Sequence, residues 1–159
     1  MARKFLLLSL LLISLSSLEI RAQSKAASQP NDDLKIGVVR NKSLLNECGC
    51  SLALGVADES KDRFVFMSDM GRKAIVNLNG KDLKLRLIAS KKGSDDPKVR
   101  DRSWEIYAAG EVKVRVDFTV RELCNPDDEA CEVIYYKATL TVTRKTQKAI
   151  VKTVGLCGC

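Results

Sequence analysis

Two copies of a Cys-Gly-Cys motif constrain this chain more than any other feature, one at residues 48–50 and one at residues 157–159. Side chains two residues apart on a strand point to the same side, so each motif presents two thiols on one face. If the two strands pair antiparallel, Cys48 lies opposite Cys159 and Cys50 lies opposite Cys157. Disulfides at these positions would join the start of a domain to its end, which predicts a closed architecture.

The remaining cysteines, Cys124 and Cys131, stand at the two ends of a short polar segment and are well placed for a third disulfide. The four thiols of the two motifs also make a ligand set for a soft metal such as zinc or copper(I). Structural zinc sites usually place two to four residues between paired cysteines, whereas a single glycine stands between them here. We therefore predict three disulfides, and neither a metal nor another cofactor.

The first residues have the pattern of a secretory signal. Arg3 and Lys4 precede an apolar run over residues 5–18, which is too short to form a stable membrane span. We expect a signal peptide at 1–22, with cleavage after Ala22 or after Ser24, a disordered lead-in at 23–33 and a single domain at 34–159. No transmembrane segment is expected after the signal is removed. A secreted or periplasmic destination is oxidising, which favours disulfides over free thiols.

Alternating apolar and polar residues predict antiparallel strands. The clearest run spans 111–123, and runs at 134–142 and 83–89 repeat the alternation, the last with Leu83, Leu85, Leu87 and Ala89 on one face. Asn79-Gly80 and Ala109-Gly110 read as hairpin turns between neighbouring runs. Further runs lie at 44–54, 63–70, 73–78, 104–108 and 148–159. This pattern predicts an all-β fold, a small antiparallel up-and-down barrel or sandwich of about eight strands, stabilised by disulfides.

The sequence favours no catalytic residue. It contains no histidine, which excludes Ser-His-Asp and Cys-His catalysis and histidine metal sites. Asp127, Asp128 and Glu129 lack the alternating ligand order of a calcium loop and are typical of a solvated turn. No two carboxylates stand out as a glycosidase pair. We therefore predict that the protein is not an enzyme.

One basic segment is a candidate binding site, because loops on rigid β scaffolds commonly bind partners. It is polar and irregular, and the chain's only tryptophan follows it. The candidate residues are Lys91, Lys92, Lys98, Arg100, Arg102 and Trp104. In the alternative interpretation the cations are merely solvated and Trp104 fills the barrel mouth or the core.

The net charge of +7 is compatible with an anionic partner and equally with simple solubility. We expect a partner, if there is one, to be an anionic protein or an envelope polyanion. Nucleic acid is disfavoured, since aromatic residues make up 5% of the chain and do not alternate with the basic ones. Asn41-Lys42-Ser43 matches a glycosylation acceptor, and whether Asn41 is modified depends on the host.

The signal, the short strands and the run 64–66 before Asn79-Gly80 resemble the small periplasmic barrels of C-type lysozyme inhibitors. The inhibitory loop of that family is rich in Ser and Gly and ends in Tyr; no segment here matches it, so the resemblance implies no site residues. The sequence predicts an exported binding or envelope-support protein without catalytic activity. The alternatives are an inhibitor of a secreted hydrolase acting through residues 91–104, and a small carboxylate-dependent hydrolase.

Overall fold

A computed structural model of the chain describes residues 33–43, 48–70, 72–125, 127 and 131–159. The expected signal peptide and nearly all of the lead-in lie outside the described residues. The chain divides into two units, Met1–Asn31 and Asp32–Cys159, and the described residues all belong to the second. The elements of this unit are β1 (Ile36–Gly37), β2 (Gly49–Ala53), α1 (Val56–Glu59), β3 (Phe64–Asp69), β4 (Lys73–Leu78), β5 (Lys81–Lys91), β6 (Arg102–Ala109), β7 (Val112–Leu123), β8 (Val133–Arg144) and β9 (Gln147–Gly158).

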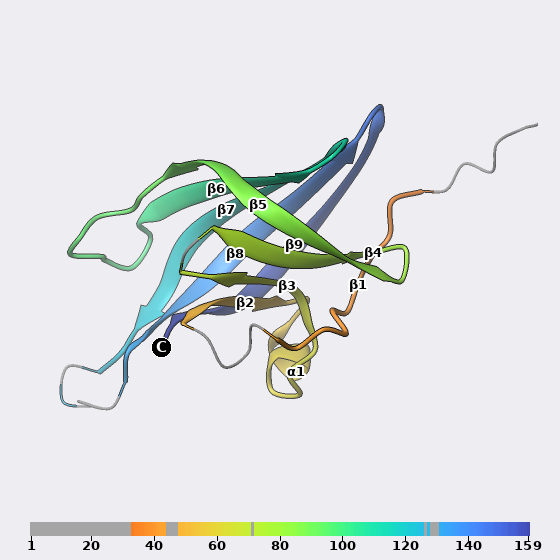
Figure 1. Cartoon of the computed structure of the whole chain (residues 1–159). Helices are drawn as coiled ribbons and strands as arrows, with labels where there is room; N and C mark the ends of the chain where they lie inside the picture. The colour runs from red at the N-terminus through yellow and green to blue at the C-terminus, as the bar shows by residue number, and fades with distance from the viewer. Residues whose placement is uncertain (1–32, 44–47, 71, 126, 128–130) are drawn as a thin grey trace, which may run out of the picture. The chain divides into compact units, whose positions relative to one another are not determined.

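The strands β2 to β9 form an antiparallel barrel (Figure 1). Each pairs with the next along the chain, and β9 returns to pair with β2. The short strand β1 is additional and pairs with the end of β4, where Ile36 lies opposite Leu78. The predicted all-β fold of about eight strands is thereby confirmed, and it is a barrel.

The closing seam is the β2–β9 pair, drawn in gold and blue in Figure 1. Cys50 lies opposite Cys157 in the register of this pair. The disulfides Cys50–Cys157 and Cys48–Cys159 form as predicted, with Cα separations of 4.0 and 4.3 Å. No cysteine of the chain is free, so the alternative of a thiolate metal site is wrong.

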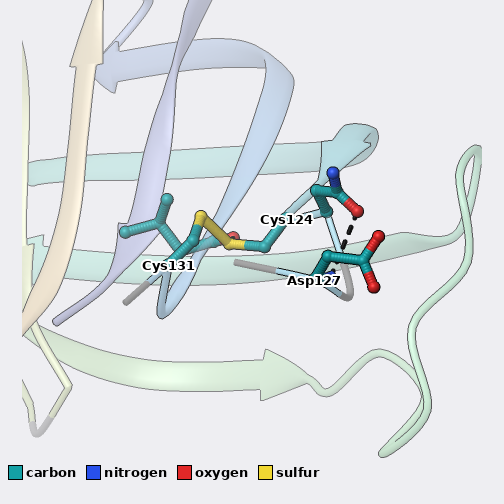
Figure 2. Close-up of a disulfide and its surroundings, with 5 residues drawn as sticks. Cys124, Asp127 and Cys131 are labelled. Carbon is teal, nitrogen blue, oxygen red and sulfur yellow. Dashed lines mark hydrogen bonds between the residues drawn. A yellow bond between two sulfur atoms is a disulfide. The ribbon is translucent and has the colours of Figure 1, made fainter. Parts of the chain in front are cut away.

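The third predicted disulfide, Cys124–Cys131, links the segment after β7 to the segment before β8 (Figure 2). Between its ends, the Asp127 N–H donates to the Asn125 side-chain oxygen at 3.2 Å, as in a local turn. The Cys124 sulfur lies 3.0 Å from the Val133 carbonyl oxygen. A disulfide sulfur carries no proton, so this is a packing contact. The other two acidic residues of the segment lie outside the described residues.

Strand alternation fills the barrel with apolar side chains. Val116 on β7 and Leu140 on β8 are fully buried, in the phase that the sequence predicts. The alternation of inward and outward side chains is interrupted in β5, where a bulge between Leu87 and Ala89 shifts the register. Ala89 therefore pairs with Ile106 and is exposed, so its predicted place on the apolar face is wrong.

Residues 33–43 cover the outer face of β3 and β4. Val39 packs there in a second apolar cluster, and its N–H donates to the Phe64 carbonyl at 2.7 Å. Asp82 accepts hydrogen bonds from the Arg40 and Asn41 N–H groups at 2.9 and 2.6 Å and from the Asn77 amide at 2.7 Å. Burial alone would raise the pKa of Asp82, but these hydrogen bonds hold it below its usual value.

The segment between β2 and β3 departs from the sequence prediction. The sequence predicts no helix there, whereas Asp58 and Glu59 belong to the short helix α1. Glu59 reaches Arg121 of β7 at 4.0 Å, so α1 lies against the outside of the barrel. No helix in the part of the chain that the structure describes is long and apolar enough to cross a membrane.

We predict that Val116→Asp lowers the free energy of unfolding by about 4 kcal/mol, because it places an unpaired carboxylate in the core. The matched control is Lys113→Asp on the same strand, where the side chain is exposed and the expected change is within about 0.5 kcal/mol. Urea unfolding measures both. Equal midpoints for the two variants would contradict the inward and outward alternation of β7.

We further predict that Gly155→Ala costs about 3 kcal/mol, whereas Gly55→Ala is nearly neutral. A Cβ at Gly155 would overlap the backbone oxygen of Ser51 on the neighbouring strand, whereas a Cβ at Gly55 meets nothing within 4 Å. Thermal unfolding of the two variants tests this close approach of β9 to β2. Similar melting temperatures for both variants would show that β9 and β2 leave room for a side chain at position 155.

Candidate functional site

The structure disperses the six predicted binding residues. β5 runs as far as Lys91 and β6 begins at Arg102, so the irregular segment spans 92–101 only. Lys98 and Asp101 form a tight turn, with the Lys98 N–H donating to the Asp101 carboxylate at 2.9 Å. The Arg100 N–H donates to the Val120 carbonyl at 2.9 Å. These contacts fix the segment against the end of β7.

Three of the predicted residues, Lys91, Arg102 and Trp104, line one depression on the outside of the barrel, which we call the outer groove. Its volume is about 850 Å³. Lys92 lines a different pocket at one end of the barrel, and Lys98 and Arg100 line neither. The remaining lining residues of the outer groove are Leu54, Ser103, Asp117, Phe118, Thr119, Lys137, Ala138, Thr139, Lys152, Thr153 and Val154.

Side chains alternate along β6, and Glu105 faces inward together with the buried Tyr107. Trp104, the neighbour of Glu105, therefore faces outward. The Arg115 guanidinium lies 4.9 Å from the centre of the Trp104 ring, in a cation–π contact. Arg115 also donates hydrogen bonds to both carboxylate oxygens of Asp117, at 2.6 to 2.9 Å. Trp104 therefore fills neither the mouth nor the core, so the alternative placement of this side chain is wrong.

Strand register brings the outer groove together from residues far apart in sequence. One row across β5 to β9 places Lys91, Trp104, Asp117, Thr139 and Lys152 side by side. The adjacent row places Arg102, Thr119, Lys137 and Val154 side by side. With strands about 4.8 Å apart, the first row extends over about 19 Å.

The groove is positively charged. Its cations are Lys91, Arg102, Lys137 and Lys152, and all four are exposed. Among its lining residues, the only acidic one is Asp117, which is paired with Arg115. The positive charges are therefore spread along the groove and do not converge on one point.

A second pocket, of about 410 Å³, opens at the end of the barrel beside the seam, and we call it the barrel mouth. Apolar groups line part of its wall, among them Leu87, Phe118 and Tyr136, together with both cysteines of the Cys50–Cys157 disulfide, and Ser90, Ser94 and Ser103 line another part. Lys91, Lys92 and Asp95 stand at its rim. Phe118 and Tyr136 meet edge to face, with ring centres 5.3 Å apart.

One carboxylate, that of Glu105, belongs to the wall of the barrel mouth. The buried Tyr107 hydroxyl donates to Glu105 at 2.6 Å, and Ser68 also hydrogen-bonds Tyr107. Burial and then the bond to Glu105 raise the pKa of Tyr107 far above its usual value. Burial, followed by the charge of Glu105, also raises the pKa of Tyr136. Both phenols therefore stay neutral across the physiological range.

Sequence reasoning missed Lys137, Lys152 and Glu105. Each stands at a polar position of a strand, where a solvated side chain is the ordinary interpretation. Only the register of several strands shows which of them share a surface. The sequence shows that Glu105 shares a strand face with Tyr107, but it does not show that this face is the inner one.

Comparison with models of protein families, with curated proteins and with solved structures finds no match to this chain. The comparisons therefore add no support to the resemblance to C-type lysozyme inhibitors. Within the described ranges, no group of three or more Cys, Asp or Glu side chains is arranged to hold a metal ion. The absence of a cofactor stays a prediction.

Proposed function

We propose that this is an exported, non-catalytic binding protein whose outer groove holds an acidic polysaccharide chain. The observation that carries the proposal is the row in which Trp104 lies between Lys91 and Lys152, with Arg102 and Lys137 in the adjacent row. Its three disulfides indicate an oxidising environment, which supports export. Acidic polysaccharides of cell envelopes and extracellular matrices occur in such an environment.

The spacing of the cations favours a polymer over a small anion. A single phosphate or carboxylate is usually held by donors that converge on it, whereas these cations are spread over about 19 Å. A chain with a negative charge at intervals matches this spread. The hydroxyls of Thr119 and Thr139 line the same groove and suit the hydroxyl groups of sugars.

The groove chemistry favours binding over hydrolysis. Glycoside hydrolysis requires an acid and a second carboxylate on opposite sides of the scissile bond. Among the described residues that line the groove, Asp117 is the one acidic side chain, and Arg115 donates hydrogen bonds to both of its oxygens. This arrangement supports a non-catalytic role for the groove.

We predict that replacing Arg102, Lys137 and Lys152 together by serine weakens binding of polygalacturonate about tenfold. Each exposed charge contributes about 0.5 kcal/mol, and three together amount to about a factor of ten. The control replaces Lys81, Lys113 and Lys148 by serine; these residues are exposed and do not line the groove. Titration calorimetry and the fluorescence of Trp104 report binding.

The control variant should bind polygalacturonate as tightly as the unmodified protein does. Rising salt should weaken the binding of polygalacturonate to both proteins. Neutral dextran should not bind. Equal affinity of the two triple variants would place the site elsewhere. Tighter binding of polyglutamate than of polygalacturonate would show that the groove is built for an acidic protein, as an inhibitor of a secreted hydrolase requires.

A further inference from the structure

We infer that the barrel mouth is a second binding site, for a small molecule with a primary ammonium group on an apolar body. This inference does not rest on the function proposed for the outer groove, although Lys91, Ser103 and Phe118 line both pockets. Trp104 points into the outer groove, whereas the next residue, Glu105, points into the barrel. The two sites therefore lie on opposite faces of the same strand.

The mouth has the size and lining of a ligand site. Its volume of about 410 Å³ suits a small organic molecule, and such sites commonly combine apolar walls with a few polar groups. The polar part of the lining includes Ser90, Ser94 and Ser103, and the apolar part includes the rings of Phe118 and Tyr136, the side chain of Leu87 and the Cys50–Cys157 disulfide. These groups are held by the seam and by the edge-to-face ring contact, so the pocket is preformed.

Glu105 gives the site its charge preference. Tyr107 donates to one oxygen of the carboxylate, which fixes its orientation. No other hydrogen bond or ion pair of Glu105 occurs among the residues that the structure describes. Its second oxygen therefore has acceptor capacity for an ammonium group that enters the mouth.

The other charged groups around the mouth are at its rim. Lys91, Lys92 and Asp95 are exposed, so water and salt screen their effect on a bound charge. Glu105 is half-buried, with Ser90 of β5 and Val116 of β7 beside it in the strand register, so its interaction with an ammonium ion is screened less than at the exposed rim. The Glu105 carboxylate therefore determines which charge on a ligand is preferred inside the mouth.

The experiment compares three fluorescent probes of one shape, namely a dansyl group on a pentyl chain that ends in an amine, a hydroxyl or a carboxylate. Dansyl emission, excited directly, reports burial of the probe in the unmodified protein. We expect the amine to bind at least about tenfold more tightly than the alcohol, and the carboxylate to bind most weakly. Equal affinity for amine and alcohol would overturn the inference, and this comparison needs no variant.

The variant Glu105→Gln removes the charge and retains an oxygen that accepts the Tyr107 hydrogen bond. We expect it to bind the amine at least about tenfold more weakly and the alcohol unchanged. Amine binding that survives this change would overturn the inference. Polygalacturonate binding should persist in Glu105→Gln, and amine binding should persist in the variant that lacks Arg102, Lys137 and Lys152. Failure at one site is therefore distinguishable from failure at the other.

Discussion

The pairing of the first barrel strand with the last is the constraint on which the rest of this structure depends. β2 and β9 are joined by two disulfides across sequence separations of 111 and 107 residues. In the chain-entropy model, closing a loop of this size stabilises the native state by about 4 to 5 kcal/mol. The strand pair is also tight, since Gly155 on β9 leaves no room for a side chain beside Ser51. Without this seam the sheet would have two open edges, which are prone to aggregation.

Closure also separates the two candidate sites. Along β6 the side chains alternate, so Trp104 belongs to the outer groove and Glu105 to the barrel mouth. The outer groove is lined by cations from four strands, and the wall of the mouth contains the carboxylate of Glu105 near the rings of Phe118 and Tyr136. The Cys50–Cys157 disulfide is part of the seam and also part of the wall of the mouth. The same covalent link thus stabilises the fold and shapes a pocket.

The features that the sequence predicts correctly are indicated by short motifs. Alternation assigned the inner face of β7 and β8, and Asn79-Gly80 forms the expected hairpin turn, with positive φ at both residues. The three disulfides follow from strand alternation and from the spacing of the cysteines. Each of these signals is carried by a short motif, and the pairing of the two Cys-Gly-Cys motifs is the one long-range feature that such motifs indicate.

The features that it does not predict need long-range register. A bulge moved Ala89 to the outer face, and nothing in the composition of that run marks the bulge. Lys137 and Lys152 join Trp104 only through the pairing of β6, β7, β8 and β9. The cover that residues 33–43 provide for β3 is equally non-local, and it explains why β3 is buried on both faces.

The most direct test of the seam is a cycle of cysteine variants measured by urea unfolding. One variant replaces Cys48 and Cys159 by serine, a second replaces Cys50 and Cys157 by alanine, and a third combines all four changes. Because both bridges close almost the same loop, removing either one alone should cost about 2 kcal/mol or less, and removing both should cost about 5 kcal/mol or more. Costs that simply add would contradict the shared loop, and a combined variant as stable as the unmodified protein would contradict the dependence of the barrel on this seam.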